Sequence, residues 1–239
     1  MFTLPEKFNR NAPDVQQLGP PADTGEMLLK YMAERVGVDL ADEDILDFGC
    51  GGRFTEAIIT KSLRVKSYTG GDLYKDLIDY LSENVRDPRF SFFHPNFQNV
   101  FYNPEGLPIH RQTELPLDRT FSLVCMFSVI THQNPMEATA TFKLLRKYVR
   151  PDGRLFFSAA IEPEMERYGE KIESKPGSLS VYADGYMRDM LRGSGWTVDS
   201  FQPKNPRGLP ILASYVCSPI LAPPGKPGVV ARMLKRIGL

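Results

Sequence analysis

Cysteine and long apolar runs are scarce in this chain, and each scarcity excludes a class of protein. Only 3 of the 239 residues are cysteine and none forms a Cys-x-x-Cys pair, so neither a disulfide framework nor a zinc site is expected. No apolar run approaches the roughly 20 residues that a membrane-spanning helix requires. The first residues lack the apolar core of a secretory signal. We therefore expect a protein of the reducing cytoplasm without a transmembrane segment.

The chain also lacks an excess of either charge. It contains 29 Lys+Arg and 29 Asp+Glu residues. This balance does not favour a dedicated nucleic-acid binder, because such proteins carry a basic surface that contacts phosphates. The length of 239 residues is enough for one domain with a sizeable core. We expect a small-molecule partner, no nucleic acid, and a monomer or homodimer.

What the sequence does contain is a glycine-rich loop between a strand pattern and a helix pattern. In ILDFGCGGRFT (45–55), apolar residues surround the carboxylate of Asp47, and Gly49, Gly51 and Gly52 follow. Glycine lets the backbone approach a ligand closely, and the start of the next helix offers free N–H groups. The order of strand, glycine loop and helix predicts a nucleotide-type site in an open α/β sheet.

The spacing of these glycines argues against a dinucleotide. A dinucleotide-binding loop has glycine at relative positions 1, 3 and 6, and the sixth position counted from Gly49 is Phe54. A second carboxylate, Asp72, ends the next predicted strand and lies 72 − 52 = 20 residues beyond Gly52. A carboxylate in that place can accept both hydroxyls of a ribose. The two observations together favour an adenosine-containing ligand.

Alternating strand and helix patterns predict a mostly parallel sheet with helices on both faces. We expect an irregular arm over 1–22, one domain over 23–218, and a linker with a short basic tail over 219–239. After residue 195 two further strands are predicted, as an antiparallel pair. The remaining elements are strands at 44–48, 66–71, 89–97, 121–130 and 154–161, helices at 23–36, 53–62, 74–85, 134–149 and 182–195, a long loop at 102–120, and a polar lid or substrate loop at 162–180.

Four segments together resemble the class I S-adenosylmethionine (SAM)-dependent methyltransferases. The resemblance implies an α/β, Rossmann-like, doubly wound, mostly parallel sheet of seven strands, with SAM as cofactor and S-adenosylhomocysteine as product. The family loop usually reads Asp-x-Gly-x-Gly-x-Gly, whereas Gly51 and Gly52 are adjacent here, so this loop is one residue short. The four segments are DFGCGGRFT (47–55), GGDLY (70–74), FSLVCMFSVITHQ (121–133) and RPDGRLFFS (150–158).

The resemblance also implies a cofactor site at the carboxyl ends of the strands. Asp72 would bind the ribose, and Asp47 would organise the glycine loop, with a secondary contact to the SAM amine. Asn96 stands where similar proteins carry the Asp that accepts the adenine amino group, and its alternative is a plain turn residue. The predicted cofactor set is Asp47, Phe48, Gly49, Gly51, Gly52, Asp72, Leu73, Asn96, Phe97, Phe127 and Ser128, with no metal.

A base is expected as well, because an unactivated hydroxyl does not lose its proton unaided at neutral pH. The chain has three histidines, His94, His110 and His132. His132 follows the fourth predicted strand, at the expected crevice, and histidine suits proton transfer near neutrality. Its alternative role is to cap the following helix or to pack beneath the cofactor. Glu162, just past the fifth strand, is the second candidate.

The sequence therefore predicts a SAM-dependent methyltransferase that transfers a methyl group in line to a hydroxyl of a small molecule, with His132 as general base. The SVITH and YNPEG strings resemble those of methyltransferases from glycan and secondary-metabolite pathways, which makes a sugar or glycoside the first expectation. Two alternatives stay open. One is an N- or carboxyl-methyltransferase of a small metabolite, and the other is a SAM-binding partner protein without catalysis.

Overall fold

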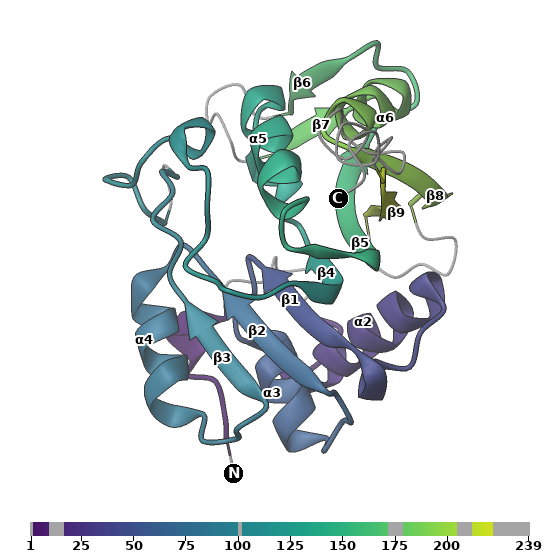
Figure 1. Cartoon of the computed structure of the whole chain (residues 1–239). Helices are drawn as coiled ribbons and strands as arrows, with labels where there is room; N and C mark the ends of the chain where they lie inside the picture. Colours follow the sequence, from purple (N-terminus) through teal and green to yellow (C-terminus); the bar gives the residue numbers. More distant parts are fainter. Residues whose placement is uncertain (1, 10–16, 100–101, 172–178, 205–211, 222–239) are drawn as a thin grey trace, which may run out of the picture.

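A nine-stranded sheet forms the centre of the computed structural model, which describes residues 2–9, 17–99, 102–171, 179–204 and 212–221 (Figure 1). The first five strands along the chain run parallel to one another, and their carboxyl ends therefore share one edge of the sheet. In spatial order they are β3 (Phe90–Phe93), β2 (Ser67–Gly71), β1 (Asp44–Phe48), β4 (Phe121–Met126) and β5 (Val149–Ile161).

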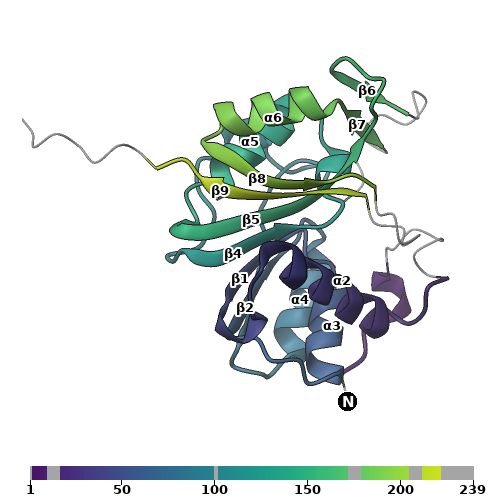
Figure 2. The ribbon, with the colours of Figure 1, turned by 90° about the vertical axis from the view of Figure 1, so that its right-hand side faces the viewer.

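Helices cover both faces of the sheet, as expected (Figure 2). Successive strand residues point to opposite faces, so Ile45 belongs to one hydrophobic cluster and Leu46 to the other. The Ile45 cluster includes side chains of α2 (Pro21–Val36), α3 (Arg53–Thr60) and α4 (Lys75–Asn84), and the Leu46 cluster includes those of α5 (Pro135–Leu145) and α6 (Asp184–Gly193).

The last two strands form the expected antiparallel pair. β9 (Ala213–Pro219) is antiparallel both to β5 and to β8 (Trp196–Gln202). The seven expected strands are thus all present. The described residues also form four short 3-10 helices: η1 (Glu6–Phe8), η2 (Leu40–Asp42), η3 (Ile109–Arg111) and η4 (Ile130–His132).

Two short strands correct the expectation of a loop over 162–180. β6 (Tyr168–Glu170) pairs antiparallel with β7 (Ser180–Tyr182), and β7 runs parallel to the end of β5 at Ala160 and Ile161. Strands of three residues are too short to show an alternating pattern, so no sequence pattern predicts them. Residues 172–178 lie outside the described part of the chain.

Other differences concern where elements end. The apolar run 121–130 predicted one long strand, but β4 stops at Met126 because Ser128 adopts a left-handed backbone with φ +57°. β5 begins at Val149 rather than at 154, and α5 ends at Leu145 rather than at 149. α2 begins at Pro21, whose fixed φ suits the first turn of a helix.

The N-terminal arm packs onto the domain. Leu4 and Phe8 are buried, and the Phe8 ring lies 5.7 Å from the Tyr74 ring and 5.3 Å from the Tyr80 ring. The Tyr80 hydroxyl donates a hydrogen bond of 3.2 Å to the carbonyl of Thr3. The predicted basic tail falls on residues 222–239, outside the described residues. Within the part that the structure describes, no helix combines the length and apolarity needed to cross a bilayer.

Candidate active site

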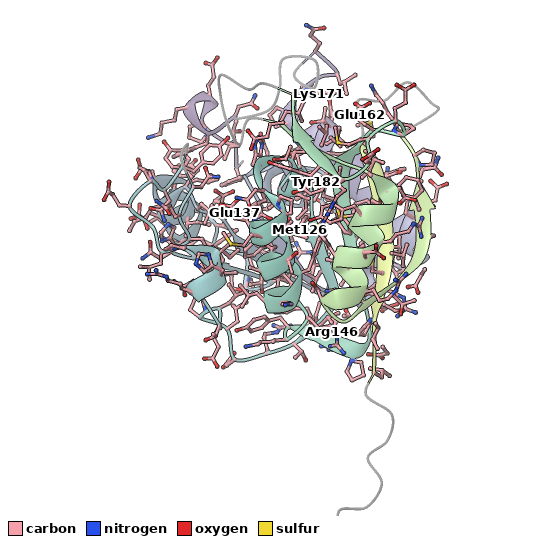
Figure 3. The ribbon with its side chains drawn as sticks, turned by 90° about the horizontal axis from the view of Figure 1, so that it is seen from above. Met126, Glu137, Arg146, Glu162, Lys171 and Tyr182 are labelled. Carbon is pink, nitrogen blue, oxygen red and sulfur yellow. The ribbon has the colours of Figure 1, made fainter. Side chains whose placement is uncertain are left out.

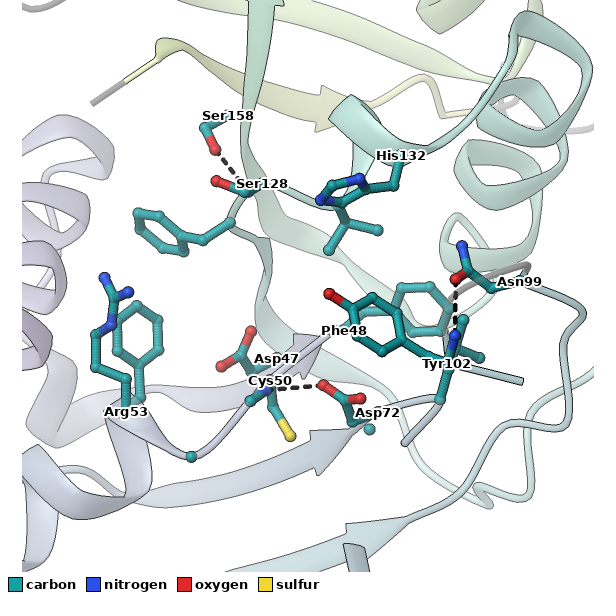
Figure 4. Close-up of a pocket in the computed structure, with 18 of the residues that line it drawn as sticks. Asp47, Phe48, Cys50, Arg53, Asp72, Asn99, Tyr102, Ser128, His132 and Ser158 are labelled. Atoms are coloured by element: carbon teal, nitrogen blue, oxygen red, sulfur yellow. Dashed lines mark hydrogen bonds between the residues drawn. The ribbon is translucent and has the colours of Figure 1, made fainter. Parts of the chain in front are cut away.

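A cavity of about 440 Å³ opens at the carboxyl ends of the parallel strands (Figure 4). Its walls come from the glycine loop, the turns after β2, β3 and β4, α2 and the N-terminal arm. Most of the residues that the sequence singled out meet here. They are Asp47, Phe48, Gly49, Gly51, Gly52, Asp72, Leu73, Phe97, Phe127, Ser128 and His132.

The glycine loop is clamped between β2 and the turn after β4. The backbone N–H groups of Gly49 and Cys50 donate to the carbonyl of Gly71 at 2.7 and 3.0 Å. Gly49 has φ +83°, and a Cβ there would lie 2.4 Å from a methyl carbon of Val129. Only glycine fits both the conformation and the space, so the loop leaves a side-chain-free floor in the cavity.

The arm covers the shortened end of this loop. A Cβ on Gly52 would lie 2.4 Å from Cδ1 of Leu4, so the leucine side chain sits directly on the glycine. Burial raises the pKa of the Glu56 carboxyl on α3, and the backbone of Leu4 lowers this pKa in part. Leu4 and Phe8 line the cavity together with the loop. No sequence pattern predicts this contact, because it joins segments that are far apart along the chain.

Asp72 is held rigidly at the end of β2. One of its carboxylate oxygens accepts the N–H of Gly51 at 2.9 Å, and the other accepts the N–H of Tyr74, also at 2.9 Å. Each carboxylate oxygen has further acceptor capacity. The side chain therefore ties the glycine loop to the start of α4 and still presents acceptors to the cavity, which it lines.

Asp47 is the most strongly perturbed acid of the cavity. It is 2% exposed, and burial raises its pKa to about 7. Hydrogen bonds from the Tyr68 hydroxyl, at 2.6 Å, and from the Cys125 thiol lower the pKa in part. The negative charge of Asp72 raises it further. A cation bound in the cavity would favour the ionised carboxylate, since opposite charges attract strongly in a buried site.

The turn after β4 is strained and braced. Ser128 is one of two non-glycine residues with positive φ among those described, and such conformations gather at functional sites. Its N–H donates to the Ser158 hydroxyl at 2.9 Å, and its carbonyl accepts the Thr131 hydroxyl at 2.7 Å. The η4 turn that follows ends at His132, whose ring borders the cavity.

The short strand β7 supports the same turn from behind. The Tyr182 hydroxyl donates to the carbonyl of Gln133, the residue after His132, at 2.5 Å. Gln133 itself lines the cavity, and its side-chain oxygen accepts the Thr141 hydroxyl. Next, Asn134 and Glu137 form a reciprocal cap on α5, and Glu137 also lines the cavity. The position of His132 is thus fixed by a strand that the sequence did not predict.

Two predicted site residues lie outside the cavity lining. Asn96 is exposed, and its side-chain oxygen accepts the side-chain amide of Asn103 at 3.1 Å. The chain beyond it pairs with itself at Phe97 and Leu107, which turns Asn96 away from the cavity. Glu162 forms an ion pair with Lys171, and Figure 3 shows this pair at a distance from Glu137 and Tyr182.

His132 is also the one histidine of the three that lines the cavity. Nε2 of His94 is hydrogen-bonded to the Leu73 carbonyl at 3.0 Å, which is a structural role, and His110 is exposed in η3. Sequence reasoning missed several lining residues because they carry no motif of their own. They are Arg53, Asn99, Gln133, Glu137 and Ser158 from the domain, and Leu4, Phe8 and Asn9 from the arm.

The comparisons with known proteins agree with this geometry. A family model described as a methyltransferase domain matches residues 8–200. The glycopeptide N-methyltransferase MtfA, solved with S-adenosyl-L-homocysteine, has a TM-score of 0.58 and 15% identity over 82% of this chain and 90% of that chain. Magnesium protoporphyrin IX methyltransferase (ChlM) from Synechocystis PCC 6803, with bound SAH, has a TM-score of 0.53 and 16% identity over 83% of each chain. At such identities the structures show a shared fold.

The cavity also fits the cofactor of that fold. Its floor is free of side chains at Gly49, its acceptors at Asp72 suit a ribose, and the buried carboxylate of Asp47 suits a cationic group. No cluster of metal-ligating side chains occurs within the described ranges. Because the family model covers most of the sequence, the chain belongs to the methyltransferase domain family and is a SAM-dependent class I methyltransferase.

Proposed function

We propose that the enzyme methylates a hydroxyl of a small molecule, with His132 as the general base. One observation carries the proposal: His132 is the histidine that lines the cavity, on a turn braced by Ser158 and Tyr182. A braced turn keeps a base in one place, and a positioned base contributes about 10²–10⁴ in rate.

The cofactor and the protein would contribute different parts of the methyl-transfer reaction. SAM, when bound, supplies an activated methyl group on a sulfonium. The protein orients the acceptor and excludes water, and holding two reactants in the right geometry is worth on the order of 7–11 kcal/mol. A ring nitrogen of His132 would accept the proton of the acceptor hydroxyl as the methyl group passes from the sulfonium sulfur to the hydroxyl oxygen. Neither Glu162 nor Lys171 takes part, since their ion pair lies away from the cavity lining.

The polar side of the cavity supports a sugar or glycoside as the acceptor. Gln98, Asn99, Gln133 and Glu137 offer amide and carboxylate groups there, and Tyr102 offers an aromatic ring. Amides and carboxylates bind the hydroxyls of a sugar, and an aromatic face packs on its C–H surface. The lining also includes the apolar residues Leu18, Met27 and Leu28, which would suit the aglycone of a glycoside.

The test is an acceptor screen followed by variants of His132. Sugars and glycosides are incubated with SAM, S-adenosylhomocysteine release is measured, and the product is examined by NMR for an O-methyl group. His132→Ala and His132→Gln should lower turnover by about 10²–10⁴ and keep SAM affinity within about twofold. His110→Ala is the matched control, because His110 is exposed outside the cavity.

An amine acceptor is the second candidate, and Glu137 is the observation that favours it. Its carboxylate lines the cavity beside the His132 turn and would attract an ammonium group. An amine needs no strong base once it is deprotonated. Full turnover of His132→Ala on an amine, together with an N-methyl product, would replace the hydroxyl proposal with this one.

A further inference from the structure

Among the described residues that line the cavity, Arg53 is the only lysine or arginine. Arg53 is the first residue of α3 and borders the cavity directly after the glycine loop. Elsewhere in the described chain, arginines such as Arg89, Arg188 and Arg192 are bonded to a nearby aspartate. Among the described residues, no carboxylate forms an ion pair with Arg53.

Three acids of α3, β1 and the end of β2 form no ion pair with Arg53 in the described chain. Glu56 lies three residues further along α3, and its Oε2 is buried without a hydrogen-bond partner among the described residues. Asp47 accepts the Tyr68 hydroxyl, and Asp72 binds the N–H groups of Gly51 and Tyr74. A guanidinium presents five donors in a planar fork that matches a carboxylate. Arg53 therefore has donors available for a ligand.

The environment of Arg53 makes an anion favourable at this point. Burial lowers the pKa of its guanidinium to about 10, because a partly desolvated cation is less stable than one in water. An anion placed beside it would offset that cost. Figure 4 shows Arg53 and Asp72 on opposite sides of Asp47. The cavity thus presents, in that order, ribose acceptors, a buried carboxylate and a cation.

This order matches the chemical order of groups in the cofactor. SAM carries an adenine on a ribose at one end, a sulfonium in the middle, and an α-amino acid with a single carboxylate at the other end. We propose that Arg53 binds this carboxylate and so orients the methionine part of SAM toward the start of α3. The proposal rests on the cofactor assignment and is independent of the nature of the acceptor.

The test compares two ligands that differ in one group. Decarboxylated SAM lacks only the carboxylate, so titration calorimetry with both ligands isolates that contact. The wild type should bind SAM about 10–100-fold more tightly than decarboxylated SAM, as expected for hydrogen bonds to a charged group. Arg53→Gln should lose this preference by weakening SAM alone. Arg53→Lys should keep part of it, because lysine retains the charge without the fork.

Arg64→Gln is the matched control, since Arg64 is exposed and lies outside the cavity lining. It should leave both affinities unchanged. Unchanged affinity for decarboxylated SAM in Arg53→Gln also shows that the variant is folded. The proposal is overturned if Arg53→Gln binds SAM as the wild type does, or if it loses both ligands equally, which would indicate a packing role. Failure of the wild type to bind either ligand would overturn the cofactor assignment as well.

Discussion

Strand β1 carries a buried aspartate toward each of its ends, and the pKa values of the two carboxyl groups shift in opposite directions. Asp44 begins the strand and Asp47 lies three residues further on, toward its carboxyl end. Asp44 is 5% exposed and Asp47 is 2% exposed. Burial disfavours the charged form of both. What differs is the set of partners that each end of the sheet supplies.

Asp44 is surrounded by cations. Its carboxylate lies 3.0 Å from Lys66 and 2.8 Å from Arg119, and it also pairs with Arg150. Burial by itself would raise its pKa, but the hydrogen bonds from Ser67, Lys66 and Arg150 and the charge of Arg150 hold the pKa well below its usual range. At this end of the sheet the charge is fully compensated within the protein.

Asp47 has only neutral donors and a second carboxylate nearby. With Tyr68, Cys125 and Asp72 as its neighbours, burial dominates and the pKa rises to about 7. The protein alone does not stabilise this charge, and such groups mark functional sites. At the amino end of the sheet, cations of the protein compensate the buried charge and stabilise the fold. At the carboxyl end no such cations compensate the charge of Asp47, and a cationic ligand would stabilise it.

The largest expected effect on stability comes from removing the carboxylate of Asp44. Asp44→Asn leaves three cations close together without their common anion, and we expect it to lower the free energy of unfolding by about 2–3 kcal/mol. This is less than for a fully buried pair, because Lys66 and Arg119 are partly exposed. Urea denaturation measures the change. Asp152→Asn, an exposed aspartate on β5, is the control, and SAM affinity should stay unchanged in both variants.

Next in size is the pH dependence that Asp47 confers on cofactor binding. A cationic ligand favours the ionised carboxylate, so SAM affinity should rise by about 10-fold between pH 6 and pH 8. Asp47→Asn should bind SAM weakly and lose this dependence, as measured by titration calorimetry at several pH values. A variant that kept the full pH dependence would show that another group is responsible.

The same residue acts on stability with the opposite sign. Because its pKa is raised from 3.8 to about 7, the free protein should lose stability as pH rises through that window. Between those values the unfolded chain is ionised at this position, whereas the folded chain remains protonated. In Asp47→Asn this component of the pH profile should be absent, while the component from Asp44 persists at lower pH.

A smaller effect is expected from Ser128, in the turn after β4 at the carboxyl end of the sheet. Ser128 holds a left-handed backbone at φ +57°, which costs a non-glycine residue on the order of 1 kcal/mol. Ser128→Gly should therefore raise the free energy of unfolding by up to about 1 kcal/mol and lower turnover, because the His132 turn loosens. Thermal unfolding and the methyl-transfer rate test the two halves separately. If Ser128→Gly increased both the stability and the methyl-transfer rate, the strained backbone would not be needed for activity.

The smallest expected effect concerns salt. Lys66 and Arg119 are 53% and 43% exposed, so 1 M NaCl should screen part of their attraction to Asp44. The stability difference between the wild type and Asp44→Asn should shrink by about 0.5 kcal/mol. The shift attributed to Asp47 should not change, because burial and not a surface ion pair causes it.

The sequence predicted local chemistry well and distant contacts poorly. The glycine loop, Asp47 and Asp72 were found because a strand, a turn and a helix start are encoded by adjacent residues. Asn96 was expected to line the site, but pairing of Phe97 with Leu107 turns it outward. Nothing in a linear pattern predicts such a reversal.

Arg53 shows a second limit. The arginine is visible in the loop motif, but its importance depends on which acids fail to reach it, and that follows only from the folded positions of Glu56, Asp47 and Asp72. Likewise the brace between Tyr182 and Gln133 depends on β7, a strand of three residues. The residues of the glycine loop that line the cavity could therefore be predicted, whereas the contacts that hold the turn at His132 could not.

The contact between Leu4 and Gly52 has a consequence for the evolution of the family. The two residues share one small volume, since a Cβ at position 52 would lie 2.4 Å from Leu4 Cδ1. A relative that carries a side chain at the position of Gly52 must therefore shorten the residue at the position of Leu4 or move its arm. Across related sequences the two positions should covary, and the length of the glycine loop should be inherited together with the arm that covers it.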